Sequence, residues 1–234
     1  MNFASRFKEK LRALRHYEPF RYPEEAIPGD YRRAAVLIPF WREGDGVRVV
    51  MTRRAAHLTD HKGQVAFPGG CLDTGESWES AALREAHEEI GLKPTRVEVL
   101  GRLDDAWSGA GHHVVPIVGW VDRPPDLVAN PREVAEILVA DVQTLLLPET
   151  RSETAFEHEG VRYVNPVLCW TGGDAYGLTA DLLLEALSWG EGVPAPGGPS
   201  RLRDLENYVR RRSDPVHPHG THPVATQSRQ GESS

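Results

Sequence analysis

The order of apolar segments predicts an α/β fold in which helices cover a mixed β-sheet. Three observations support this prediction: strand-like runs at residues 34–40 and 47–52, an acidic helical segment that ends near Leu92, and further strand-like runs followed by a helical segment at residues 179–187. Helices that follow strands in this order bury their apolar faces most readily when they form layers against a sheet. We therefore expect an α/β/α layered domain.

The first 30 residues are predicted to form a helix and a connector. Large apolar residues recur at helical spacing over residues 2–16, with charged residues between them: Phe3, Phe7, Leu11 and Leu14. We expect this helix to pack at the edge of the domain, and a helix lying on a membrane surface is the alternative. Prolines at positions 19, 23 and 28 then interrupt regular structure.

Residues 31–190 carry the signals of one domain. The runs at 34–40 and 47–52 flank a turn at residues 43–46 and predict a β-hairpin. Residues 114–121 are almost entirely apolar, which predicts a strand buried on both faces. Residues 133–147 show both strand and helix signals. The remaining predicted elements are strands at 97–103, 154–158, 161–164 and 167–170, and a core helix at 179–187 whose buried side carries Leu182, Leu183 and Leu187.

The composition changes near residue 190. Residues 191–234 are rich in Pro, Gly, His and Ser and poor in large apolar residues, so we expect a flexible tail that cannot offset its ordering entropy. Residues 201–212 could form a short charged helix within this tail. Three histidines have a spacing that suits a metal, although a solvated tail is the preferred interpretation: His217, His219 and His222.

Composition excludes several classes of protein. The chain has 27 Lys and Arg against 34 Asp and Glu, a net charge of −7, which argues against a general nucleic-acid-binding protein. No apolar run approaches the ~18 residues of a membrane span, and no signal peptide is recognisable. Cys71 and Cys169 are too few for a disulfide framework or a zinc site. We therefore expect a cytoplasmic protein without a membrane or nucleic-acid partner.

Three carboxylates in the acidic helix indicate a metal site. Glu88 and Glu89 follow Glu85 by three and four residues, so the three side chains are expected on one helix face. Like charges at this spacing destabilise a helix unless a cation lies among them, and clustered oxygen ligands suit Mg²⁺ or Mn²⁺. On these carboxylates alone, a solvated acidic face is the alternative.

The residues around these carboxylates form a longer pattern. Eight positions fit the spacing G-x5-E-x7-R-E-U-x-E-E-x-G-U, where U is a bulky aliphatic residue, and Ala86 is the one departure: Gly70, Glu76, Arg84, Glu85, Glu88, Glu89, Gly91 and Leu92. This pattern resembles the Nudix box, the signature of hydrolases that cleave diphosphates linked to another group. The resemblance implies the Nudix-type α/β/α sandwich with a mixed β-sheet. Local chemistry agrees, because Ser77 or Glu76 can cap the helix and Gly91 can end it in the left-handed conformation.

A second pattern precedes the box. Eight residues match most of the pattern L-L-T-x-R-[SA]-x3-R-x3-G-x3-F-P-G-G. They are Thr52, Arg54, Ala55, Gly63, Phe67, Pro68, Gly69 and Gly70. This resembles the coenzyme A pyrophosphatase branch of the Nudix family, and further similarity extends over roughly residues 34–187. Thr59 stands where the pattern has its second Arg, and Val50-Met51 replace two leucines. The resemblance implies a small-molecule substrate, coenzyme A, that is hydrolysed to 3′,5′-ADP and 4′-phosphopantetheine.

The resemblance and the chemistry of the side chains assign roles. We expect Glu85 and Glu89 to be the first ligands of Mg²⁺ or Mn²⁺, with Glu88 a further ligand or the base that activates water. Arg84 is expected to orient the glutamates, in part through Glu76. Glu133 or Glu136 could supply a carboxylate from outside the helix, although surface charge is the preferred interpretation for both.

Substrate contacts are expected in the segment before the helix. The Arg54 guanidinium can grip phosphate oxygens in a two-pronged way. Gly69 and Gly70 allow a tight loop that brings the backbone close to a ligand. His57 and His61 could add positive potential to this loop, but a packed or capping role explains each histidine at least as well.

Two other functions stay open at this point. Thr59 leaves room for a Nudix hydrolase with another substrate, such as ADP-ribose, a dinucleoside polyphosphate or a nucleoside triphosphate. A catalytically silent nucleotide-binding module is the second alternative, although such a module has no need of three clustered carboxylates.

Overall fold

The computed structural model describes residues 1–23, 27, 31–57, 63–108, 111–123, 125–158 and 161–193, with the backbone alone at 155–158 and 161–165. Several expectations from the sequence fall outside these residues. They concern Thr59, His61, the charged helix at 201–212, the three tail histidines and nearly all of the tail itself.

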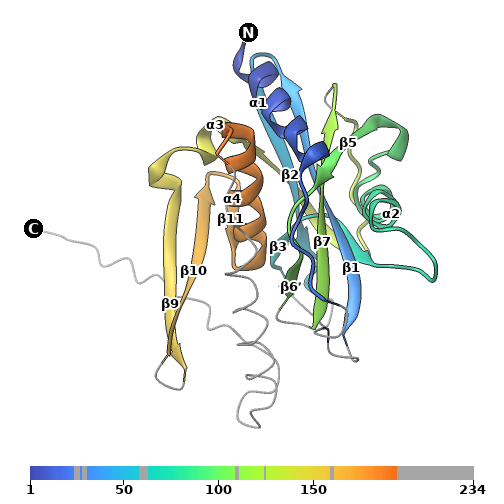
Figure 1. The fold of residues 1–234 in the computed structure, drawn as a ribbon, viewed down its shortest axis with the longest axis vertical. Coiled ribbons are helices and arrows are strands. Elements are labelled where there is room, and N and C mark those ends of the chain that lie inside the picture. Colours follow the sequence, from blue (N-terminus) through green and yellow to red (C-terminus); the bar gives the residue numbers. More distant parts are fainter. Residues whose placement is uncertain are drawn as a thin grey trace, which may run out of the picture.

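A mixed eight-stranded sheet forms the centre of the molecule (Figure 1). The path β3-β2-β1-β7-β5 runs through it, while β4 pairs with β1, β6 with β7 and β8 with β2. Strands β1 and β7 are parallel, with Ala35 opposite Val115, and the other pairs are antiparallel. The strands are β1 Arg32–Glu43, β2 Gly46–Arg54, β3 Val65–Ala66, β4 Gly69–Cys71, β5 Val97–Arg102, β6 Ala106–Ser108, β7 His112–Val121 and β8 Val134–Asp141.

A second sheet of three strands lies beside α4 (Figure 1). Its order is β11-β10-β9, with β9 Arg151–His158, β10 Val161–Trp170 and β11 Gly173–Tyr176. The sequence predicted two short strands within 161–170, and this division is wrong. Strand β10 is continuous because Asn165 and Pro166 remain paired with the facing residues of β9.

Helices cover both faces of the central sheet and confirm the α/β/α sandwich. Helix α2, Trp78–Ile90, packs on one face, where Ala82 and Ile90 meet Leu37 and Ile117. Helices α1, Phe3–Leu11, and α4, Leu178–Glu191, cover the other face (Figure 1). The short helical turns are η1 Arg12–His16, η3 Pro94–Arg96, α3 Val142–Leu145 and η4 Pro148–Thr150. The ambiguous segment 133–147 therefore holds β8 followed by α3.

Helix α1 belongs to the core. Its N-cap is Asn2, whose Oδ1 accepts a hydrogen bond from the Ser5 N–H at 3.0 Å. The Phe7 ring is 1% exposed and meets the Phe40 ring edge-on at 5.4 Å between centroids. Because the apolar side of α1 is buried against the sheet and α4, it is not available to a membrane surface. Within the described residues, no helix has both the length and the apolar character needed to cross a bilayer.

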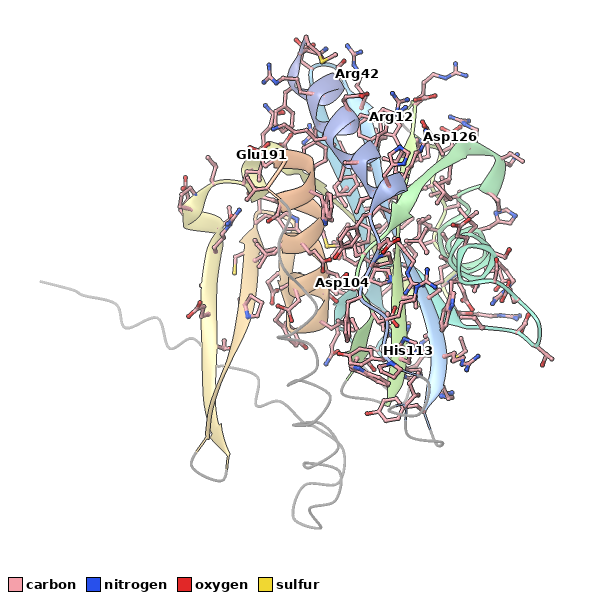
Figure 2. All side chains as sticks on the ribbon, in the orientation of Figure 1. Arg12, Arg42, Asp104, His113, Asp126 and Glu191 are labelled. Carbon is pink, nitrogen blue, oxygen red and sulfur yellow. The ribbon has the colours of Figure 1, made fainter. Side chains whose placement is uncertain are left out.

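Two buried aspartates hold the connector that follows η1. The Asp104 carboxylate accepts hydrogen bonds from the Tyr17 hydroxyl at 2.6 Å and from the Phe20 N–H at 2.8 Å. The Asp105 carboxylate accepts a hydrogen bond from the Tyr22 N–H at 3.1 Å and contacts His113 Nε2 at 2.8 Å. Figure 2 shows His113 at one end of the sheet. These contacts fasten the connector to the β5–β6 loop and to β7.

Candidate active site

Helix α2 has well-defined ends. Ser77 is the N-cap, and its hydroxyl accepts a hydrogen bond from the Ser80 N–H at 3.1 Å. Gly91 ends the helix in the left-handed conformation with φ of 71°, and its N–H bonds to the His87 carbonyl at 2.9 Å. Both ends agree with the sequence, and they fix which residues of α2 face strand β4.

The two glycines before the helix allow close packing. The sequence predicted a tight loop here, but Gly69 and Gly70 lie in strand β4, opposite Val36 and Ala35 of β1. A Cβ atom at position 69 would overlap the β1 backbone. At position 70 it would overlap the Glu85 carboxylate instead. Glycine is therefore needed for close approach at both positions, and neither has a positive φ.

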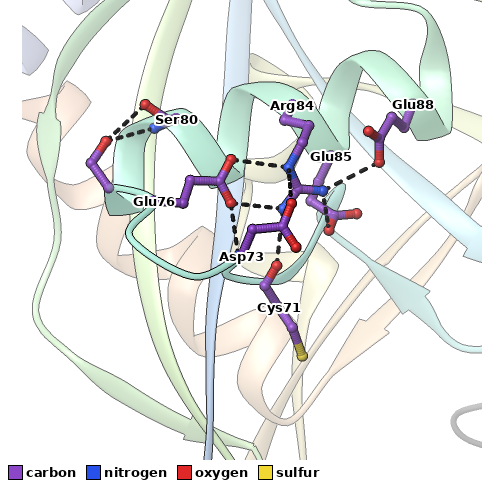
Figure 3. A network of polar contacts seen from close by, with 8 residues as sticks. Cys71, Asp73, Glu76, Ser80, Arg84, Glu85 and Glu88 are labelled. Carbon is purple, nitrogen blue, oxygen red and sulfur yellow. Dashed lines mark hydrogen bonds and ion pairs between the residues drawn. The ribbon is translucent and has the colours of Figure 1, made fainter.

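Arg84 is the centre of an ion-pair network (Figure 3). It donates to both oxygens of Glu76 at 2.9 and 3.0 Å, to Glu85 Oε1 at 2.8 Å and to the Cys71 carbonyl at 3.0 Å. These contacts raise the pKa of Arg84 above its usual range and lower that of Glu76. The arrangement links the loop before α2 to Glu85, and the guanidinium has little freedom left to contact a substrate.

Three carboxylates converge beside β4. Ligand oxygens of Glu85, Glu89 and Glu133 all lie within 4.8 Å of one another. Glu85 and Glu89 were expected together. For Glu133 surface charge was the preferred interpretation, but the structure favours the alternative, a carboxylate supplied from outside the helix. Glu88 lies apart from this cluster: its side chain is 53% exposed and pairs with Arg84 at 3.3 Å. Glu136 does lie at the surface, where it pairs with Arg53 at 3.2 Å.

Backbone contacts at the end of α2 explain the position of Glu133. The Asn130 N–H donates to the Glu89 carbonyl at 2.8 Å, and the Glu133 N–H donates to the Asn130 carbonyl at 3.0 Å. The turn from Asn130 to Glu133 is therefore attached to the helix that carries the other two carboxylates. The Asn-Pro pair at 130–131 is a turn signal in the sequence, but a turn signal does not say where the turn docks.

Burial and like charges perturb the clustered carboxyls. Burial raises the pKa of Glu89 to about 8, with Glu85 and Glu133 adding to the rise. The Arg54 guanidinium and a hydrogen bond from the Gly69 N–H act in the opposite direction. Burial also raises the pKa of Glu85, against the opposing effect of Arg84. Without a cation, the ionised form of Glu89 is therefore disfavoured at neutral pH.

The charge of Arg54 reaches this carboxylate cluster. This arginine is the last residue of β2, at a register irregularity in the pairing with β8, and its charge acts on Glu89. Its Nε is buried and has no hydrogen-bond partner among the described residues. His57 follows on the same segment, and its Nε2 contacts the Arg132 carbonyl at 2.9 Å, the contact of a capping histidine.

The donor set fits a divalent metal ion. Glu89 Oε2 is buried without a hydrogen-bond partner in the described part of the chain, and an unpaired buried oxygen is costly. The three carboxylates offer only oxygen ligands, which Mg²⁺ and Mn²⁺ prefer over the softer nitrogen and sulfur ligands. A bound cation would satisfy that oxygen and relieve the repulsion within the cluster.

Comparisons with known proteins identify the family of this chain. The NUDIX domain family model matches residues 30–155. The uncharacterized Nudix hydrolase NudL of Yersinia pestis (strain Pestoides F) is 38% identical over 153 residues, which cover 65% of this chain and 76% of that protein. A Nudix hydrolase structure from Nitrosomonas europaea aligns with a TM-score of 0.48 and 16% identity, covering 72% of this chain and 77% of the other. For RenU from M. smegmatis the TM-score is 0.43 and the identity 22%, with coverage of 76% and 87%. The family match and the NudL relationship show that this chain belongs to the Nudix hydrolase family, pyrophosphohydrolases that act on phosphorus-containing anhydrides.

Proposed function

We propose that this hydrolase cleaves the diphosphate of coenzyme A or its acyl derivatives, giving 3′,5′-ADP and 4′-phosphopantetheine. One observation carries the proposal: Arg54, from the segment that resembles the coenzyme A pyrophosphatase branch, is close enough to the carboxylate cluster for its charge to act on Glu89. The phosphate-gripping residue and the hydrolytic residues would therefore meet the same diphosphate. We place the reaction in the cytoplasm, since both cysteines are free thiols and suit a reducing compartment.

Glu85, Glu89 and Glu133 are the proposed metal ligands. A bound Mg²⁺ or Mn²⁺ would neutralise charge on the diphosphate and make water a stronger acid. Glu88 is the proposed base that accepts the proton of the attacking water, since Arg84 holds its exposed carboxylate near Glu85. Arg84 itself positions Glu85 and Glu88. Arg54, Gly69 and Gly70 complete the proposed substrate site.

Two substitutions separate the metal ligands from the base. Glu89→Gln is expected to weaken Mn²⁺ binding and to lower the rate by roughly a hundredfold or more. Glu88→Gln is expected to keep Mn²⁺ binding, measured by titration calorimetry, while kcat falls by roughly a hundredfold. Weakened Mn²⁺ binding in Glu88→Gln would show that Glu88 is a metal ligand and not the base. A wild-type rate in Glu89→Gln would refute the assignment of Glu89 as a metal ligand.

A substrate panel tests the substrate. Coenzyme A, acetyl-coenzyme A, dephospho-coenzyme A, ADP-ribose and a dinucleoside tetraphosphate are incubated with Mg²⁺ or Mn²⁺, and products are identified by mass. We expect the highest kcat/KM on coenzyme A or its acyl form. Binding of all nucleotides without any product would instead indicate a silent binding module.

Arg54→Ala tests the phosphate contact. We expect KM for coenzyme A to rise and the loss to be smaller on dephospho-coenzyme A, which lacks the 3′-phosphate. Arg53→Ala is the matched control, because the neighbouring arginine pairs with Glu136 instead. Equal losses on both substrates would remove the proposed grip on the 3′-phosphate.

A Nudix hydrolase with another nucleotide substrate is the second candidate. The observation that favours it is Thr59, which stands where the coenzyme A pattern has an arginine. An ADP-ribose or dinucleoside polyphosphate rate above the coenzyme A rate would support it.

A further inference from the structure

A chain of backbone hydrogen bonds connects two carboxylates of the cluster. The Glu89 carbonyl accepts the Asn130 N–H at 2.8 Å, and the Asn130 carbonyl accepts the Glu133 N–H at 3.0 Å. Asn130 is thus the only residue between Glu89 and Glu133 along this path. Any shift of Asn130 relative to α2 moves the Glu133 carboxylate relative to Glu89.

The side chain of Asn130 stabilises the turn that it begins. Its Oδ1 accepts a hydrogen bond from the Arg132 N–H at 3.2 Å, an Asx-turn. Pro131 fixes one backbone angle at the second position of the turn, and the Asn130 carbonyl also accepts the Val134 N–H at 2.8 Å. This local bonding makes the turn rigid before it docks on α2.

The turn has to resist a repulsive force. Glu133 brings its carboxylate to Glu85 and Glu89, and like charges this close repel each other. Two more contacts oppose the displacement of Glu133: the Ala55 N–H donates to its carbonyl at 2.9 Å, and the Val128 N–H donates to the Ile90 carbonyl at 3.0 Å. Of these holding residues, Asn130 alone contributes through both its backbone and its side chain.

We infer that Asn130 is a positioning residue for the reaction: its turn holds the Glu133 carboxylate against Glu85 and Glu89. This inference rests on the proposed function, because it matters only if Glu133 acts in hydrolysis. In this inference Asn130 acts through the position of Glu133 and not on the substrate itself. Errors of about 1 Å in the placement of such a group lower rates by up to roughly a hundredfold.

Three variants of position 130 provide the first test. Asn130→Ala removes the acceptor for the Arg132 N–H, and we expect kcat to fall by roughly tenfold with KM little changed. Asn130→Asp keeps an acceptor and is expected to restore most of the rate. Asn130→Ser, whose hydroxyl forms the same bond more weakly, is expected to lie between them and replaces the alanine variant if that protein does not fold. Asn2→Ala is the matched control, since it also deletes an asparagine oxygen that accepts a backbone N–H, but at the start of α1.

A double-mutant cycle separates positioning from general loss of structure. Glu133→Gln alone is expected to lower kcat, and adding Asn130→Ala to it should cause no further loss, because the group to be positioned is already gone. Multiplicative losses would overturn the inference while leaving the proposed role of Glu133 intact. A wild-type rate for Glu133→Gln would refute that role, and the inference with it. Equal kcat losses in Asn130→Ala and Asn2→Ala would also overturn it.

Discussion

Glu89 is buried at a position where its charge lowers stability. Its carboxyl is 3% exposed and one oxygen has no hydrogen-bond partner in the described structure, yet it faces two further carboxylates. Burial of this kind raises the free energy of the ionised protein. Ionised Glu89 therefore destabilises the metal-free protein, and a bound cation would remove this destabilisation.

The raised pKa of Glu89 predicts how pH changes the stability of the metal-free protein. The pKa of Glu89 rises from an ordinary 4.5 to about 8 on folding, so its contribution to stability is fully present below pH 4.5 and is lost as the pH rises to about 8. In EDTA at pH 8, Glu89→Gln should raise the free energy of unfolding by about 2 kcal/mol. Denaturant titrations at pH 5 and pH 8 measure it.

The exposed neighbour Glu88 is the control for this stability effect. Glu88→Gln should change the free energy of unfolding little at either pH, since its side chain is 53% exposed. Identical pH slopes for the wild type and Glu89→Gln would contradict the expected burial of charge.

Substitution of Gly69 should mainly lower stability, whereas substitution of Gly70 should mainly lower activity. A Cβ at position 69 meets the backbone of β1, which cannot move easily, so Gly69→Ala should cost about 1–3 kcal/mol of stability. A Cβ at position 70 meets only the end of the Glu85 side chain, so Gly70→Ala should fold but lose roughly tenfold in kcat. Thermal melts and rates on the same samples test both, and a reversed pattern would contradict the packing described for β4.

At this scale the sequence predicted that Glu85 and Glu89 lie together, as they do in the structure. Glu85 and Glu89 were recognised from helical spacing and from the box, because both signals lie within one short segment. For Glu133 a place beside them was only the less favoured of two interpretations, because its position depends on hydrogen bonds to a helix more than 40 residues earlier in the chain. Glu88, although part of the same motif, lies outside the cluster because the face that it occupies is turned toward solvent.

At the scale of elements, ion pairs connect α1 and η1 to β5. Glu98 contacts Lys8 at 2.8 Å, Arg15 at 2.5 Å and Arg12 at 3.5 Å. The Lys8 ammonium, followed by the two arginines, holds the pKa of Glu98 below its ordinary value. Such a carboxylate stabilises the fold above its ordinary pKa and ceases to do so as the pH falls through its lowered value.

Glu98→Gln tests this junction. At pH 7 we expect a loss of about 1 kcal/mol in the free energy of unfolding, limited by partial exposure of the partners. The difference between variant and wild type should shrink toward pH 3 and with added salt, because protonation and screening remove the same interaction. A difference that stays constant over pH would show that packing, not charge, is lost.

Element prediction succeeded for long patterned segments and failed for short ones. Strands β1 and β7 and helix α2 were predicted because many residues repeat one pattern. Strands β3, β4, β6 and β11 have two to four residues each, too few to show a period. They are strands because longer neighbours offer them hydrogen-bond partners, and this is a property of the assembled sheet.

In the whole molecule, the core extends beyond the part that matches the family. The match begins at residue 30, but Phe7 of α1 is buried between Phe40 of β1 and Gly190 of α4. Phe7→Ala should therefore cost about 3–5 kcal/mol of stability, measured by denaturant unfolding. Leu147→Ala, at a side chain 45% exposed, is the control and should cost little. Similar small losses for both would mean that α1 is not part of the cooperative core.

The layered architecture was predictable from the order of elements, and the sheet topology was not. Helices that follow strands imply layers, but several strand orders bury the same apolar faces. The parallel pairing of β1 with β7 and the position of β8 beside β2 depend on long-range contacts that no local pattern encodes.

The packing of α1 against α4 also governs when the protein can fold during synthesis. Phe7 and Gly190 are 183 residues apart (190 − 7), so the ribosome delivers one side of this contact long before the other. Until α4 emerges, the apolar side of α1 lacks one of its partners, and the growing chain presents it to chaperones and proteases. A fragment ending at Tyr176 should remain protease-sensitive while the full chain resists digestion. We therefore expect the core around Phe7 to be completed only after α4 has left the ribosome.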